Sequence, residues 1–124
     1  MLAGEGMKIP SQWSVELTHF GRKSGKPFKL RVWYVEIDGD LWVGTRDKTN
    51  HWVRNLRATG RAELDFGQEG VAFGCEQAAS EAEQQRFDQA ILAKHPIAGR
   101  LIVAMARGKS PCCFRLIADA PTSD

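Results

Sequence analysis

The sequence has few of the residues that mark metal, disulfide and hydrolytic sites. Its three cysteines, Cys75, Cys112 and Cys113, have no C-x-x-C spacing and indicate neither a zinc site nor a disulfide framework. We expect reduced thiols packed in strands. The three histidines are scattered, and there is no G-x-S-x-G motif, so neither a metal site nor a Ser-His-Asp site is predicted. We interpret the histidines as structural or surface residues, with His51 kept open because it adjoins a predicted anion site.

Long apolar runs are also missing. None approaches the length of a membrane span, and residues 1–13 lack the apolar core of a secretory signal. We therefore expect a cytoplasmic protein with no membrane span. The 124 residues are the usual size of one domain, so a single domain over residues 1–124 is predicted.

Signals for nucleotide triphosphates and nucleic acids are weak. The glycines of residues 21–25, GRKSG, follow neither the P-loop nor the dinucleotide-binding spacing. Trp33, Trp42 and Trp52 are stacking candidates for a single-stranded nucleic acid. However, the net charge is only +2, and these aromatics do not alternate with cations along one exposed strand. We expect no nucleic-acid partner.

The charge that is present is distributed unevenly. Residues 22–61 hold ten Lys and Arg against four acidic residues, whereas residues 62–90 hold seven acidic residues against Arg86 alone. One half of the molecule is therefore suited to an anion. The alternative is that the basic and the acidic residues form two solvent-exposed faces of opposite charge, which would give the same distribution along the sequence.

Alternating apolar and polar residues predict mainly strands. Residues 14–46 are expected to form a three-stranded meander, with Asp38-Gly39 as the type I′ turn of its second hairpin. The next predicted strands are 61–67 and 71–78, followed by a last strand over 111–118. A helix is predicted over 50–60, with Asn50 as a capping candidate and Gly60 as the C-terminal stop, and another over 80–96, where Ser80 and Glu83 have the spacing of a capping box. The ambiguous segment 97–108 is interpreted as a third helix.

This order predicts an α+β protein of about six mostly antiparallel strands with two or three helices. Such a sheet favours a small barrel, closed or partly open, because closure removes the strand edges. Trp42 is expected on the face opposite Val43. We therefore predict a homodimer that buries an apolar face of the barrel.

The second predicted strand carries a candidate binding face. Its period of two places Lys29, Arg31 and Trp33 on one side. The opposite side is expected to be core and consists of Phe28, Leu30, Val32 and Tyr34. Two cations followed by an indole suit an anionic head with a flat ring. The alternative is an exposed exterior on which Trp33 covers a helix.

A second group of polar residues follows the third predicted strand. Thr45, Arg46 and Lys48 precede a helix, whose free N–H groups together with cations make an anion site suited to phosphate. The hairpin is expected to bring Lys29 and Arg31 alongside them. Ordinary capping, with the cations in solvent, is the alternative.

Three motifs in residues 18–67 occur together in a known family. They are THFGRKSGKP, the aromatic pair WY before the DGD turn, and WVRNL before a strand. With them the chain resembles the flavin/deazaflavin-dependent nitroreductase family. The resemblance implies a split β-barrel of the pyridoxine-phosphate-oxidase type, which binds a deazaflavin coenzyme or FMN and passes a hydride to a small organic acceptor.

The resemblance also implies roles for individual residues. Arg22 and Lys23 belong to the G-R-K-S-G turn, Thr45 and Arg46 begin the phosphate loop, and Trp33 lies on the cofactor side. Trp52 and Asn55 match W-x-x-N. Together with the strand cations, the predicted cofactor-binding residues are Lys29, Arg31, Trp33, Thr45, Arg46, Lys48, Trp52 and Asn55.

Two departures from the family pattern bear on function. Phe28 stands where the family has an arginine, and the loop before Trp52 has lost the glycines that allow close backbone approach to a phosphate. Two functions remain open. One is an oxidoreductase acting on a small-molecule substrate, and the other is a non-catalytic split-barrel protein that binds a flavin, haem or hydrophobic ligand.

Overall fold

The computed structural model describes residues 12–45, 49–67, 70–78, 80–105 and 111–118. Within these ranges seven strands form one antiparallel sheet, in the order β2-β1-β5-β6-β7-β4-β3. The strands are β1 (Val15–Phe20), β2 (Pro27–Val32), β3 (Tyr34–Ile37), β4 (Asp40–Thr45), β5 (Arg61–Asp65), β6 (Val71–Gln77) and β7 (Cys112–Ala118). The helices are α2 (His51–Thr59), α3 (Glu81–Lys94) and α4 (Pro96–Met105).

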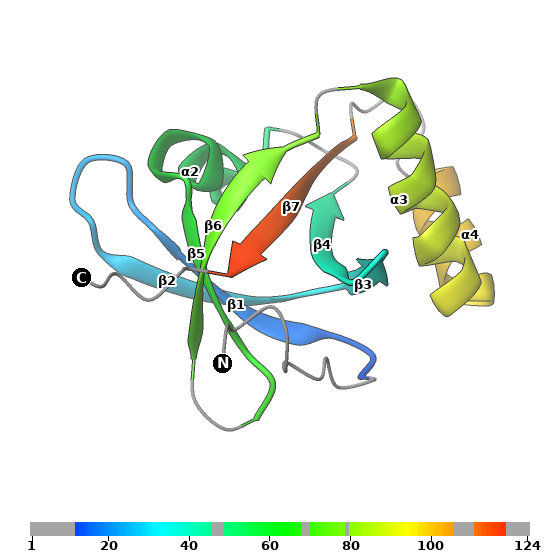
Figure 1. Ribbon diagram of the computed structural model, residues 1–124, viewed down its shortest axis with the longest axis horizontal. Helices are drawn as coiled ribbons and strands as arrows, with labels where there is room; N and C mark the ends of the chain where they lie inside the picture. The colour runs from blue at the N-terminus through cyan, green and yellow to red at the C-terminus, as the bar shows by residue number, and fades with distance from the viewer. Residues whose placement is uncertain (1–11, 46–48, 68–69, 79, 106–110, 119–124) are drawn as a thin grey trace.

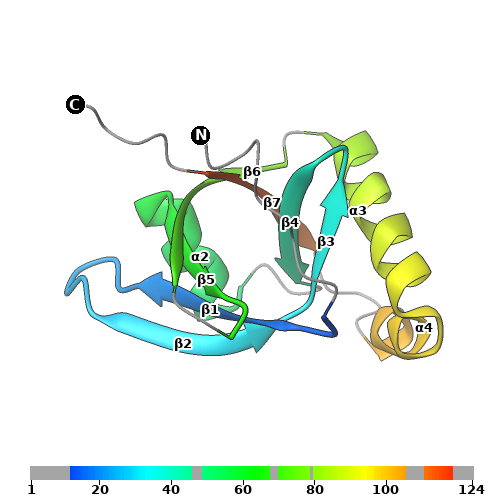
Figure 2. The same ribbon diagram turned by 60° about the horizontal axis from the view of Figure 1, so that its bottom comes forward.

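The sheet curls into a half-barrel, with β1 and β2 on one side and β3 and β4 on the other (Figures 1 and 2). Helices α3 and α4 lie together outside the β3–β4 side, while α2 lies at the opposite end of the molecule, beside the projecting turn between β1 and β2. This is the predicted α+β split-barrel architecture. No helix among the described residues is long and apolar enough to cross a bilayer.

The structure corrects the predicted meander at Trp33. The second strand is divided there, because β2 ends at Val32 and pairs with β1, whereas β3 begins at Tyr34 and pairs with β4. Because β2 and β3 pair with different neighbours while Val32 and Tyr34 are both buried in one core, the chain bends around that core between them. The described residues therefore contain seven strands where about six were predicted, and the two halves of the divided strand lie at opposite ends of the sheet order.

Most of the predicted turn and helix signals are confirmed, although Asn50, which precedes α2, makes no side-chain capping hydrogen bond. Asp38 and Gly39 have φ values of 53° and 85°, as a type I′ turn requires. Helix α2 ends at Gly60, which is left-handed with φ 67°. The hydroxyl of Ser80 accepts a hydrogen bond from the backbone N–H of Glu83 and caps α3. Residues 96–105 are helical, as interpreted, and 106–108 lie outside the described residues.

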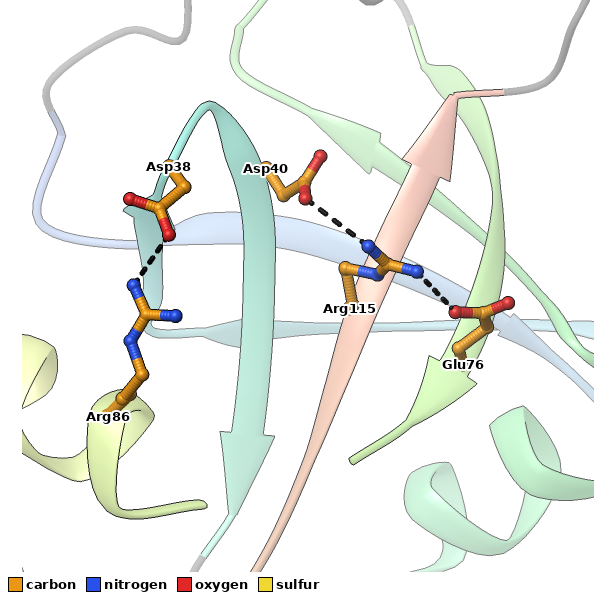
Figure 3. Close-up of polar contacts among 5 residues, drawn as sticks. All are labelled: Asp38, Asp40, Glu76, Arg86 and Arg115. Atoms are coloured by element: carbon orange, nitrogen blue, oxygen red, sulfur yellow. Dashed lines mark hydrogen bonds and ion pairs between the residues drawn. The ribbon is translucent and has the colours of Figure 1, made fainter. Parts of the chain in front are cut away.

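Exposed ion pairs link the β3–β4 turn to its neighbours (Figure 3). Arg86 of α3 donates a hydrogen bond to Asp38 across 2.6 Å. Arg115 of β7 lies between two carboxylates, 2.7 Å from Glu76 of β6 and 3.5 Å from Asp40 of β4. These side chains are largely exposed, so each pair adds little to stability and mainly fixes the turn against α3 and β7.

Apolar residues pack on both sides of the sheet. The inner cluster fills the half-barrel, and Trp52, Val53 and Leu56 of α2 complete it. The outer cluster joins the sheet to α3 and contains Val35, Trp42, Phe87, Ile91 and Cys113. Trp42 is only 7% exposed. The sequence-based expectation that Trp42 supplies a dimer surface is therefore wrong, because α3 of the same chain covers it.

Candidate functional site

A cavity of about 590 Å³ lies between the β1–β2 turn and α2. Small-molecule pockets usually measure about 300–1,000 Å³, so this cavity is large enough for a cofactor ring. Its wall is formed by the end of β1, the turn, the start of β2 and the side of α2 that carries His51 and Asn55. The residues that line it are His19, Gly21, Arg22, Lys23, Ser24, Phe28, His51 and Asn55.

The G-R-K-S-G sequence shapes the turn. Gly25 has φ 71°, a left-handed conformation that glycine adopts without strain, and its N–H donates to the carbonyl of Gly21 across 3.0 Å. A Cβ at Gly21 would lie 2.7 Å from the hydroxyl oxygen of Ser24. The two glycines therefore permit a tight turn, which places Arg22 and Lys23 at the cavity wall.

A chain of hydrogen bonds connects the turn to α2 and β1. Arg22 Nη1 donates to Asn55 Oδ1 across 2.8 Å. Asn55 Nδ2 lies 2.8 Å from His19 Nδ1. Asn55 and His19 are 5% and 7% exposed, so the two side chains form a buried polar contact beneath the cavity. Their hydrogen bonds offset the cost of burying polar groups.

His19 and Phe28 make a flat wall on the inner face of the β1–β2 hairpin. They are paired across the two strands, and their rings stack with centroids 5.5 Å apart and 24° between the planes. Burial lowers the pKa of His19, and the nearby His51 lowers it further. Near neutral pH the imidazole of His19 is therefore neutral.

The predicted strand cations lie away from this cavity. Lys29 and Arg31 alternate with Phe28 along β2, so their side chains project from the opposite face of the sheet. Lys29 lies 3.9 Å from a carboxylate oxygen of Glu16. Arg31 donates hydrogen bonds of 2.9 Å to the hydroxyl and the carbonyl of Ser14. Nor is β2 a neighbour of β4 in the sheet, so the expected meeting of these cations with Thr45 does not occur there.

The other predicted residues are also dispersed. Trp33 stacks on His95, and Trp52 is 7% exposed in the inner core. Thr45 accepts a hydrogen bond from Asn50 Nδ2 across 2.9 Å, just before α2. Arg46 and Lys48 lie outside the described residues. Of the predicted residues that the structure describes, Asn55 is the one that lines the cavity.

Sequence reasoning misplaced Phe28 and passed over His19. Phe28, expected in the core, is 48% exposed, because β2 projects beyond the core at this end and only β1 pairs with it. His19 continues the inward series of Val15 and Leu17 and therefore shares the inner face with Phe28. The signal was available, since a turn at residues 21–26 fixes the register that pairs these two residues.

A second cavity, of about 460 Å³, lies beside α2 and is lined by Thr49, Arg54, Arg57 and Gln77. Arg57 Nε donates to Gln77 Oε1 across 3.0 Å, so part of its positive charge is already engaged. Among the described residues, no group of three His, Cys, Asp or Glu side chains is placed to hold a metal ion.

Solved structures with this fold have several functions. The chain matches the F420-H2-dependent reductase FDR-A with a TM-score of 0.68 and 17% identity, over 90% of this chain and 99% of that one. It matches the conserved hypothetical protein Rv2991 of Mycobacterium tuberculosis with a TM-score of 0.67 and 20% identity, over 87% and 74%. For the haem storage protein HutZ of Vibrio cholerae the values are 0.64 and 14%, over 86% and 82%.

These identities establish the fold alone. No curated protein matches the chain. The model of one family, described as F420H(2)-dependent quinone reductase, matches residues 2–100, which is most of the sequence and includes the turn, the hairpins and α2. The chain therefore belongs to the F420H2-dependent quinone reductase family.

Proposed function

We propose that this protein is an oxidoreductase that binds the deazaflavin coenzyme F420 in the cavity beside the G-R-K-S-G turn and reduces a quinone or another small organic acceptor. The observation that carries the proposal is the composition of the cavity wall. Arg22 and Lys23 come from the turn, while the stacked rings of His19 and Phe28 form the wall of the adjoining hairpin. A deazaflavin has a flat ring joined to an anionic tail, and the two kinds of surface suit these two parts.

The residues present fit such a coenzyme. Two cations and the hydroxyl of Ser24 offer charge-assisted and neutral hydrogen bonds to a phosphate or a carboxylate. None of the described residues that line the cavity is acidic, so none of these side chains repels an anion. FMN also combines a ring with a phosphate. The family of the chain is what favours the deazaflavin over FMN.

The chain's own contribution is binding and orientation. When bound, the reduced deazaflavin supplies a hydride, and the acceptor gains that hydride and a proton from water while the coenzyme is oxidised. Arg22 and Lys23 hold the anionic part, and the His19–Phe28 wall aligns the ring. His51, exposed at the cavity wall, is placed to contact the acceptor or the ring edge.

The non-catalytic alternative has one specific observation in its favour. The fold is shared with a haem storage protein. The half-exposed Phe28 and the neutral His19 are also compatible with an apolar macrocycle. A haem iron would require His19 or His51 as its ligand, which gives this alternative a spectroscopic signature.

The test compares three ligands on the purified full chain. We expect saturable binding of F420 with a shifted visible spectrum, weaker binding of FMN, and oxidation of reduced F420 that depends on an added quinone. Haem binding with an imidazole-ligated Soret band, and no F420 binding, would replace the proposal with the haem alternative. Binding of F420 without any turnover would leave a coenzyme-binding protein and reject the oxidoreductase.

Two sequence-based predictions stay open beside this proposal. Arg46 and Lys48 remain predicted contacts for the anionic part of the coenzyme. The homodimer also remains a prediction, without Trp42 at its interface. Asn55, in contrast, enters the proposed site through its hydrogen bonds rather than by direct contact with a phosphate.

A further inference from the structure

We propose that Arg22 and Asn55 lock His19 as the neutral Nε2–H tautomer, and that this N–H is the hydrogen-bond donor to a carbonyl or anionic oxygen on the ring portion of the bound coenzyme. The choice of coenzyme rests on the proposed function. The lock on His19 is a property of the protein alone and is tested without any ligand.

The orientation of the Asn55 amide follows from Arg22. A guanidinium has only donors, so the Asn55 atom that faces Arg22 Nη1 at 2.8 Å must be the acceptor Oδ1. The amide nitrogen of Asn55 is then directed at His19, 2.8 Å from its Nδ1. Rotation of the amide would set its NH₂ group against the guanidinium, so Arg22 holds Asn55 in one orientation.

The tautomer of His19 follows from Asn55. An amide NH₂ group is only a donor, so His19 Nδ1 must be the acceptor and carries no proton. In a neutral imidazole the proton then resides on Nε2. Protonation at Nδ1 would place two donors against each other, 2.8 Å apart, beneath the cavity.

The second ring nitrogen of His19 is available to a ligand. Nε2 has no hydrogen-bond partner among the described residues, and it is not one of the buried unpartnered nitrogens, both of which belong to His95. Because His19 lines the cavity, an accessible Nε2–H faces the space that a ligand would fill. Because this N–H is already held in one orientation, its hydrogen bond to a ligand requires little free energy for reorganisation of the protein.

The charged groups around His19 reinforce the neutral form. Arg22 and Lys23 from the turn and His51 from α2 line the same cavity, and no acidic residue among the described lining residues opposes them. Phe28, stacked on the ring, adds no charge. A proton added to His19 therefore meets only positive or neutral groups among the described residues of the cavity wall, and it also breaks the Asn55 contact.

This arrangement divides recognition between two parts of the ligand. The flexible cations of the turn suit the anionic tail, whereas a neutral N–H with a fixed direction suits a carbonyl or anionic oxygen of the ring. A site built to hydrogen-bond a ligand atom discriminates strongly against analogues that lack it. His19 is therefore a specificity-determining residue for the ring, and Arg22 and Asn55 act through it as positioning residues.

The first experiment measures the tautomer and pKa of His19 by ¹⁵N NMR on the ligand-free protein. Wild type should show an unprotonated Nδ1 and a protonated Nε2. Arg22→Ala should raise the pKa of His19 and mix the tautomers, because Asn55 is free to rotate. Lys23→Ala is the matched control, since it removes a cation from the same cavity without touching Asn55. Arg22→Lys should restore the single tautomer.

A smaller change in Lys23→Ala than in Arg22→Ala supports the lock. Equal changes in the two variants, or an Nδ1–H tautomer in wild type, would overturn it. Backbone chemical shifts away from the turn show whether each variant is folded. Should Arg22→Ala fail to fold, Asn55→Asp offers a second route, because a carboxylate facing Nδ1 favours the imidazolium and must raise the pKa of His19 if the contact exists.

The second experiment concerns the ligand. His19→Phe keeps an aromatic ring for the stack and loses the N–H, and we expect it to weaken F420 binding about tenfold, as loss of one hydrogen bond predicts. His19→Gln, which keeps a side-chain N–H, should recover much of the loss. If wild type binds F420 and His19→Phe binds equally well, the donor role is wrong. If wild type binds no F420, the proposed function fails, and the donor role toward it fails too, while the NMR result still decides the lock.

Discussion

Trp33 stacks on His95, with ring centroids 4.0 Å apart and 22° between the ring planes. Trp13 meets the same imidazole edge to face, with centroids 4.1 Å apart. His95 is 1% exposed, and neither of its ring nitrogens has a hydrogen-bond partner among the described residues. Burial lowers the pKa of His95, the neighbouring Lys94 lowers it further, and an interaction with the backbone of Trp13 offsets part of this decrease. The imidazole is therefore held as a neutral ring between indoles.

This environment predicts a loss of stability in acid. Because the folded pKa of His95 lies below the unfolded value of 6.5, the unfolded chain takes up the proton first as the pH falls. The free energy of unfolding should therefore be highest above about pH 6.5. Below that pH it should decrease by at most about 1.4 kcal/mol per pH unit for each such histidine. His19 adds a contribution of the same sign.

The measurement is urea unfolding between pH 5 and pH 8. His95→Phe, which keeps an aromatic ring against Trp33, should show a smaller acid loss than wild type. Gln85→Ala, at an exposed position of α3 without an ionisable side chain, serves as the control and should keep the wild-type slope. An unchanged slope in His95→Phe would mean that the buried imidazole does not control acid stability.

A second prediction concerns the close packing of α3 on β4. A Cβ at Gly44 would lie 2.7 Å from two ring carbons of Phe87 and 2.8 Å from the carbonyl oxygen of Cys112. We expect Gly44→Ala to lower the free energy of unfolding by about 1–3 kcal/mol, the usual cost of overpacking. Gly74→Ala on β6 is the matched control, because its Cβ would meet no atom closer than 3.9 Å. Chemical denaturation of both variants tests this, and equal losses would contradict it.

Local signals in the sequence predicted most of the fold. The alternation of β1, the Asp38-Gly39 turn, Gly60 after α2 and the Ser80 cap of α3 each depend on residues close together in the chain, and the structure contains all four. The division at Trp33 depends instead on closure of the sheet. No local pattern distinguishes a straight strand from one that turns around a core formed by distant residues.

The candidate site was harder to predict for the same reason. The two-residue period of a strand correctly placed Lys29 and Phe28 on opposite faces of the sheet. It did not show which of the two faces meets the cavity. That choice depends on α2, which approaches the inner face of the hairpin through the Arg22–Asn55 contact. Asn55 was found through the family motif, whereas His19 was set aside as one of three scattered histidines.

The adjacent cysteines give a third prediction. Cys112 lies in the inner core and Cys113 in the core beneath α3, so they face opposite sides of the sheet, as neighbouring residues of a strand do. Both are buried, and neither forms a disulfide within the part of the chain that the structure describes. Replacing both with alanine should lower the free energy of unfolding and leave F420 affinity within about twofold of wild type, since neither lines the cavity. Weakened binding by a stably folded double variant would contradict this.

The homodimer can be tested by sedimentation of the full chain at micromolar concentration. Ile97 and Leu101 are candidates for the dimer interface, because they are apolar side chains one turn apart on α4 that are 78% and 61% exposed. If a dimer forms through α4, Leu101→Glu should shift it to the monomer mass while the fold is retained. A monomer in wild type would reject the homodimer, and a dimer unaffected by Leu101→Glu would place the interface elsewhere.

The last prediction decides between the two faces of the β1–β2 hairpin. Lys23 lines the cavity, whereas Lys29 lies on the opposite face near Glu16. If the coenzyme occupies the cavity, Lys23→Ala should weaken F420 binding by about 1 kcal/mol and reduce the dependence of affinity on salt, because one screened charge contact is lost. Lys29→Ala removes the same side chain from the same hairpin and should bind like wild type at both ionic strengths. Fluorescence titration of both variants at low and high salt measures these effects. The reverse result, a loss in Lys29→Ala and none in Lys23→Ala, would return the site to the Lys29, Arg31 and Trp33 face that the sequence first indicated.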